Sequence, residues 1–170
     1  IDELWVHPFR VARNFQAGIV SGDSVAWLRN LPVAVDVRPE SFTRTYQTQY
    51  GRLREIIFSS LNGPGAVVHY DFEGDTPVQI VVKYRSDLRW MWPYDERALG
   101  DVYYGYDEIL GALHVRDVSG DFYCVVGSDV KPLKHLSGHY GDILWTSGAF
   151  SGTPTEANQV YHASLYDVSR

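Results

Sequence analysis

Carboxylate pairs are the first residues in this chain whose spacing could support catalysis. Asp71 and Glu73 stand two residues apart at the end of a strand-like segment, so both side chains can lie on one face. Further carboxylates occur in a tyrosine-rich stretch, namely Asp95, Glu96, Asp101, Asp107 and Glu108. Glycoside hydrolysis needs two carboxyl groups across the scissile bond, about 5–5.5 Å apart for retention or about 6.5–9.5 Å for inversion. The sequence does not position such a pair, and loop carboxylates are more often solvated surface groups.

Aromatic residues suggest a binding surface instead of a catalytic one. Trp90, Trp92 and Tyr94 alternate along the chain, so all three rings point to one face if the segment stays extended. Such rings either close the end of a β-core or form a platform for a flat ligand such as a sugar. We expect Trp92 to pack, either in the core or against another domain, because Pro93 follows it and fixes the chain there. The candidate substrate-binding residues are Trp90, Trp92, Tyr94 and Tyr104.

Metal, nucleophile and cofactor motifs are not recognisable. His135 and His139 are four residues apart, but the intervening Leu136-Ser137-Gly138 indicates a turn, and the sequence offers no third convergent ligand. The chain has no Gly-x-Ser-x-Gly motif, and Gly63-Pro64-Gly65 links two strand-like segments where a phosphate loop would have to open a helix. The single cysteine, Cys124, lies in an apolar run and is expected to be a buried, inert thiol. We therefore predict no metal and no cofactor.

Composition narrows the possible partners. The chain has 170 residues and a formal net charge of −6, with only 15 Lys and Arg, which argues against nucleic acid and anionic membranes as partners. No apolar stretch approaches the length of a transmembrane helix. Residues 1–170 fit one domain. Because the chain starts at Ile1 and not at Met, we expect it to be processed, trimmed or one piece of a longer polypeptide.

Strand-like segments recur along the chain, and helical periodicity is nearly absent. The best helical candidate, Ser21–Leu31, is weakened by its β-branched residues and glycine. The expected strands are Val33–Val37, Thr43–Tyr50, Leu53–Leu61, Ala66–Phe72, Val78–Leu88, Val102–Tyr106, Ala112–Asp117, Phe122–Gly127, Ile143–Phe150 and Gln159–Tyr166. The longest irregular stretch is expected at Pro93–Gly111.

One of these segments indicates how the strands are layered. Val78, Ile80, Val82 and Tyr84 alternate with Gln79, Val81, Lys83 and Arg85. The apolar Val81 on the second face indicates that both faces of this strand are covered. We predict an all-β fold, an antiparallel two-sheet β-sandwich.

The order of several segments resembles a known family of domains. The phrases are Leu31 to Pro39, Phe42 to Tyr46, Leu53 to Phe58, Gly63 to Val68, Val82 to Leu88 with Met91-Trp92-Pro93, Leu110 to Leu113, and Val125 to Ser128. Together they resemble the N-terminal β-supersandwich domain of bacterial glycogen-debranching-like and trehalase-like glycosidases. In that family an all-β domain precedes an (α/α)₆ toroid that carries the catalytic acid and base. Because nothing in this chain corresponds to the toroid, the resemblance supplies no catalytic residue.

Three hypotheses follow, in order of preference. The resemblance implies a non-catalytic accessory domain that packs on the helical catalytic domain of a carbohydrate-active enzyme. The second hypothesis is an autonomous carbohydrate-binding module that stacks an oligosaccharide on Trp90, Trp92 and Tyr94. The third is a small stand-alone glycosidase that uses the carboxylates of the tyrosine-rich stretch.

Overall fold

The chain folds into antiparallel β-sheets. The computed structural model describes residues 3–92 and 100–168, and strands make up 66% of the chain. In chain order the strands are β1 (Glu3–Val6), β2 (Phe9–Ser21), β3 (Ser24–Trp27), β4 (Val33–Val37), β5 (Phe42–Thr48), β6 (Gly51–Ser59), β7 (Ala66–Glu73), β8 (Val78–Ser86), β9 (Arg89–Trp90), β10 (Val102–Asp107), β11 (Ala112–Asp117), β12 (Tyr123–Gly127), β13 (Lys134–Gly138), β14 (Tyr140–Thr146), β15 (Ala149–Pro154) and β16 (Val160–Val168). A 3₁₀ helix, η1 (Leu28–Asn30), is the one helical element of the described residues, which contain no helix suited to crossing a membrane. The predicted all-β, antiparallel class is confirmed.

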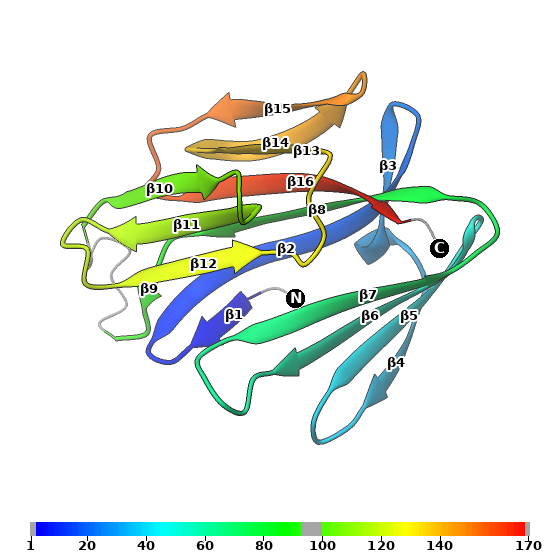
Figure 1. The fold of residues 1–170 in the computed structure, drawn as a ribbon, viewed down its shortest axis with the longest axis horizontal. Helices are drawn as coiled ribbons and strands as arrows, with labels where there is room; N and C mark the ends of the chain where they lie inside the picture. Colours follow the sequence, from blue (N-terminus) through cyan, green and yellow to red (C-terminus); the bar gives the residue numbers. More distant parts are fainter. Residues whose placement is uncertain (1–2, 93–99, 169–170) are drawn as a thin grey trace.

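The other sheets of the molecule pack on a central sheet (Figure 1). Its strands follow the order β1-β2-β8-β16-β13, and the short strands β3 and β9 each pair with β2. Strand β8 therefore lies between β2 and β16, with Arg85 opposite Arg13 on one side and opposite Tyr161 on the other. Since all of these pairs are antiparallel, alternate residues of β8 face opposite sides of the sheet.

Two smaller sheets cover one face of the central sheet. Val78 and Ile80 of β8 pack with Tyr46 and Leu53 of the sheet β4-β5-β6-β7. Tyr84, further along the same face of β8, packs with residues of the sheet β10-β11-β12 such as Leu113 and Val115. Val82 contacts both clusters. The layer that covers this face of the central sheet thus consists of two sheets that lie beside each other (Figure 1).

The β14–β15 hairpin covers the opposite face, as the apolar Val81 predicted. Val81 is buried, and Lys83 on the same face is buried too. The Lys83 ammonium donates to Asp142 Oδ1 at 2.7 Å and to the Ile143 carbonyl at 3.1 Å. Ile143 packs with Tyr161 of β16 in a separate core cluster. Both faces of β8 are therefore shielded from water, and the buried Lys83 ammonium is paired with Asp142.

Several expected segments have different boundaries. Ile143–Phe150 is not one strand, because a turn at Ser147 and Gly148, both with positive φ (52° and 75°), divides it into β14 and β15. Ser21–Leu31 contains β3 and η1 and no α-helix. The stretch Pro93–Gly111 is not irregular throughout, because it includes β10. Leu136-Ser137-Gly138 is part of β13 and not a turn.

Candidate functional site

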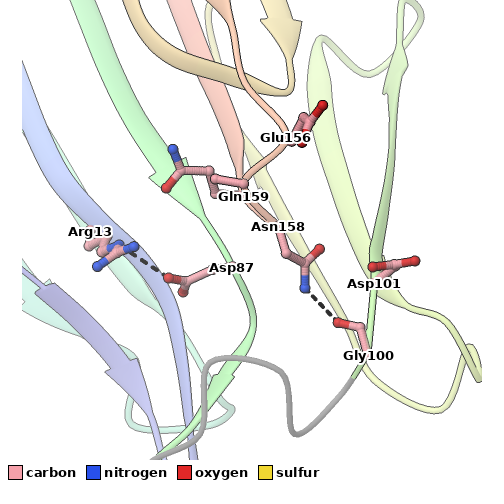
Figure 2. Close-up of a pocket in the computed structure, with 8 residues that line it drawn as sticks. Arg13, Asp87, Gly100, Asp101, Glu156, Asn158 and Gln159 are labelled. Atoms are coloured by element: carbon pink, nitrogen blue, oxygen red, sulfur yellow. Dashed lines mark hydrogen bonds and ion pairs between the residues drawn. The ribbon is translucent and has the colours of Figure 1, made fainter.

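A polar pocket lies at the end of the central sheet where β8 ends, close to the start of β10. Its volume is about 470 Å³, and its lining residues are Arg13, Asp87, Gly100, Asp101, Glu156, Ala157, Asn158 and Gln159. They come from β2, from the segment after β8, from the start of β10 and from the connection between β15 and β16 (Figure 2). Four segments that are distant in the sequence thus converge on one cavity.

A buried ion-pair network forms one side of the pocket. The guanidinium of Arg10, which is only 3% exposed, donates to Asp87 Oδ2 at 2.6 Å and to Glu3 Oε1 at 2.6 Å. Arg13 Nε lies 3.1 Å from the same Asp87 oxygen. Burial alone would lower the pKa of Arg10, but the carboxylates of Asp87 and Glu3 outweigh it and raise that pKa. The Asp87 carboxyl group is therefore held by two guanidinium groups as a structural ion-pair partner.

Two amide side chains hold the opposite side of the pocket in place. Asn158 accepts a hydrogen bond from the Val102 amide at 2.8 Å and donates to the Gly100 carbonyl at 2.5 Å. Gln159 is buried, and its amide donates to the Tyr140 carbonyl at 3.2 Å. These bonds tie the β15–β16 connection to the start of β10 and to β14, so the pocket wall is built from fixed backbone segments.

Two further carboxylates are free at the pocket's rim. Asp101 and Glu156 are exposed, and within residues 3–92 and 100–168 neither makes a hydrogen bond or an ion pair. Together with Gln159 and Arg13 they belong to the polar lining of the cavity. Groups of this kind suit a neutral ligand with several hydroxyl groups.

The predicted aromatic platform is not continuous. Strand β9 ends at Trp90. The centroid of the Trp90 ring lies 4.5 Å from that of Phe9 and 5.5 Å from that of Phe122. The chain bends at Met91, and Trp92 is 79% exposed. Trp92 therefore does not pack into the core formed by the described residues, whereas contact of its ring with a neighbouring domain stays a prediction. Trp90 and Trp92 therefore do not share one face, and Tyr94 lies outside the described residues.

Tyr104 lies close to the pocket without lining it. Its half-exposed ring contacts the ring of His139 edge-on, with centroids 5.2 Å apart. His139 Nδ1 lies 2.9 Å from the carbonyl oxygen of Gln159, a pocket residue. His135 and His139, which the sequence analysis did not accept as a metal site, have separate contacts: the ring centroid of His135 lies 3.6 Å from that of Tyr106.

An exposed aromatic row on the outer face of the β10-β11-β12 sheet escaped the sequence analysis. Tyr103, Arg116 and Tyr123 stand opposite one another in register on these three strands. The Arg116 guanidinium lies 5.0 Å from the centre of the Tyr103 ring, and Tyr123 is 72% exposed. The alternation within each strand could have indicated a shared face, but the pairing of the three strands was needed to align them.

The row lies at the same end of the molecule as the pocket. Tyr103 follows the pocket residues Gly100 and Asp101, and Tyr123 follows Phe122, which contacts Trp90. We call Trp92, Tyr103, Arg116 and Tyr123 together the aromatic surface.

The remaining candidate residues have structural partners. Asp71 and Glu73 do share one face of β7, where they form ion pairs with Arg54 and Arg52. Asp107 accepts hydrogen bonds from the backbone amides of Ile109 and Leu110 at 2.8 and 2.9 Å. Glu108 Oε1 lies 3.1 Å from His135 Nε2. Asp95 and Glu96 lie outside the described residues. Residues 3–92 and 100–168 contain no group of three or more metal-ligating side chains.

Cys124, which is partly buried, and His162, which is buried, have shifted pKa values. Burial raises the pKa of Cys124, whose sulfur lies 3.5 Å from Ser86 Oγ. His162 lies between Ser137 Oγ at 2.8 Å from Nδ1 and Ser164 Oγ at 2.6 Å from Nε2. Burial, with a smaller contribution from His135, lowers the pKa of His162 to about 3. A ring that is neutral near pH 7 and enclosed by two hydroxyl groups serves packing and not proton transfer.

Comparison with known proteins adds no relative. No family model matches this chain, and neither the curated proteins nor the solved structures give a match.

Proposed function

We propose that this chain is a non-catalytic accessory β-sandwich domain of a carbohydrate-active enzyme and that it packs on a helical catalytic domain. The observation that carries the proposal is the aromatic surface. Trp92, Tyr103, Arg116 and Tyr123 are borne by segments that meet at one end of the sandwich, beside the polar pocket.

The composition of this surface is that of a protein interface. Trp, Tyr and Arg are the residue types that most often dominate the binding energy of protein–protein contacts. A tryptophan that is 79% exposed leaves most of a large apolar ring in water, and covering it with a partner would recover that free energy. Arg116, exposed beside Tyr103, adds a donor that can reach carbonyl groups of a partner.

The carbohydrate part of the proposal is supported by the resemblance to glycosidase-associated supersandwich domains and by the chemistry of the pocket. Carboxylate, amide and guanidinium groups are those that hydrogen-bond sugar hydroxyls. On this proposal the pocket faces the rim of the partner's active site. The exposed carboxyl groups of Asp101 and Glu156 would then accept hydrogen bonds from hydroxyl groups of a bound glycan.

The alternative function is an autonomous carbohydrate-binding module. The registered row of Tyr103 and Tyr123 favours it, because two exposed rings on a sheet face can stack against successive sugars. The two candidates differ in what covers the aromatic surface, a protein domain in the first case and a glycan in the second.

The test compares hydrogen exchange in the full encoded polypeptide with exchange in residues 1–170 alone. We expect the backbone amides of residues 101–104 and 116–123 to exchange more slowly in the full polypeptide. A Trp92→Asp change should remove part of that protection, whereas Leu144→Asp, an exposed residue of the β14–β15 hairpin, should not. Equal exchange in both proteins, or a reading frame without a helical domain, would overturn the proposal.

Two tryptophan variants distinguish a ring that stabilises the fold from a ring that is available to bind a partner or a sugar. Trp92→Ala should change the free energy of unfolding by no more than about 0.5 kcal/mol, because the ring is exposed. Trp90→Ala should cost about 1–3 kcal/mol, because it loses two ring contacts, with Phe9 and Phe122. Urea denaturation followed by circular dichroism measures both changes. Calorimetric titration of the Trp92→Ala protein with maltohexaose and cellohexaose then reports sugar binding. Loss of an affinity that the unaltered chain has would favour the binding module.

A further inference from the structure

Strand β4 is an open edge of the sheet β4-β5-β6-β7. It pairs with β5 on one side and has no described neighbour on the other (Figure 1). All five of its residues are exposed, and three of them are valines on one face: Val33 at 47%, Val35 at 53% and Val37 at 70%. An exposed apolar edge strand is a template for pairing with another strand.

The backbone of β4 shows which residues are free to pair. Arg38 and Ser41 exchange two backbone hydrogen bonds, N to O at 2.9 and 3.3 Å. Because hydrogen-bonded pairs alternate along an antiparallel ladder, Asp36 and Ala34 also bond to β5, at Thr43 and Thr45. The N–H and C=O groups of Val33, Val35 and Val37 therefore point away from the sheet.

The usual protections of an edge strand are missing from this segment. Residues 33–37 contain no lysine and no proline, and the register with β5 runs without a bulge. The one charge in the strand, Asp36, lies on the face opposite the valines and forms an ion pair with Arg38 at 3.0 Å. Asp36 therefore does not block the apolar face of the edge.

The order of the five residues suits a second copy of the same strand. We propose that β4 pairs antiparallel with β4 of a second copy, about a twofold axis at Val35. This register places Val33 opposite the partner subunit's Val37 and Ala34 opposite the partner subunit's Asp36. All six valines then lie on one face, and the two aspartates do not face each other. The resulting sheet would continue from β7 of one copy to β7 of the other.

The proposed pairing extends an apolar strip that already exists. Val37 stands opposite Phe42, and Phe42 stands opposite Ile57, both half-buried on the same face. The valines of the second copy would lie beside this strip and cover part of it. The inference concerns a different surface from the aromatic surface and does not depend on the proposed function.

Two variants that each introduce one lysine into β4 test the register. Sedimentation or light scattering over a concentration series should show that the unaltered chain dimerises. Val35→Lys puts two ammonium groups opposite each other across the axis, and we expect the dissociation constant to rise about 100-fold or more. The matched control is Ala34→Lys, which places each lysine opposite the partner subunit's Asp36 and should leave the dimer intact or strengthen it. Circular dichroism checks that both variants stay folded.

Hydrogen exchange gives a second, site-specific measurement. In the dimer the amides of Val33, Val35 and Val37 should become protected, while those of Ala34 and Asp36 are protected at every concentration by β5. A chain that stays monomeric up to its solubility limit overturns the proposal. So does a dimer that Val35→Lys leaves unchanged, or one that Ala34→Lys breaks as strongly as Val35→Lys does.

Discussion

Replacing Asp87 by alanine should lower the free energy of unfolding by about 3–5 kcal/mol. Asp87 is 9% exposed and neutralises Arg10 and Arg13, which both bond or approach its carboxylate. Without it, Arg10 keeps only Glu3 as a charged partner and remains buried between β1, β2 and the end of β8. An incompletely compensated buried charge is one of the few single changes that can cost this much. Urea denaturation at pH 7, followed by circular dichroism, measures the loss.

A surface ion pair is the matched control for this prediction. Glu73 pairs with Arg52 on the exposed face of β7, where both side chains are about half exposed. Glu73→Ala should cost no more than about 1 kcal/mol, because solvent already screens that pair. The double variant Arg10→Met with Asp87→Ala should recover part of the loss, since it removes the buried charge as well. If Asp87→Ala and Glu73→Ala cost the same, the Arg10 network is not the buried unit described here.

Lowering the pH should destabilise the fold through His162. Its pKa is about 3 in the folded protein, against 6.5 without burial, so the unfolded chain binds a proton that the folded chain rejects. The stability that the neutral ring contributes is complete above pH 6.5 and is lost as the pH falls from 6.5 towards 3. Between pH 7.5 and pH 4.5 this loss amounts to about 2–3 kcal/mol.

The contribution of His162 is isolated by comparing variants across that pH range. His162→Gln keeps an amide donor and acceptor for Ser137 and Ser164 but cannot titrate. Its unfolding free energy should fall less steeply with acidification than that of the unaltered chain. His114→Gln, an exposed histidine of β11, tests whether the loss of any histidine gives the same profile. Parallel curves for the unaltered chain and His162→Gln would contradict the assignment.

Local sequence patterns predicted strands correctly where each face of the strand carries residues of one kind along its length. Val33–Val37 and Ala112–Asp117 were predicted with the boundaries that the structure has. The long strand β2 was missed, because a bulge between Arg13 and Gln16, with Asn14 at φ 52°, breaks its alternation. Charged residues that pair in the interior, such as Arg10 with Asp87, resemble exposed surface residues when only the sequence is known.

The pocket was beyond the reach of sequence reasoning for a different reason. Arg13 and Asn158 line the same cavity although the chain between them spans most of the molecule. Periodicity reports which face of its own strand a residue occupies, but not which distant segment lies opposite. The exposure of Trp92 could not be predicted from its alternation with Trp90, because strand β9 ends at Trp90 and the chain bends at Met91.

The position of β8 has a consequence for how the chain reaches its native state. Its two ladder partners, β2 and β16, come from opposite ends of the described sequence. Contacts between such distant segments must close large loops before they gain stability, which slows folding. During synthesis β8 would leave the ribosome long before residues 160–168, with the backbone groups along one edge unpaired. Until β16 is synthesised, that edge can pair with other chains. Pairing of β16 with β8 therefore removes an aggregation-prone edge from the nascent protein.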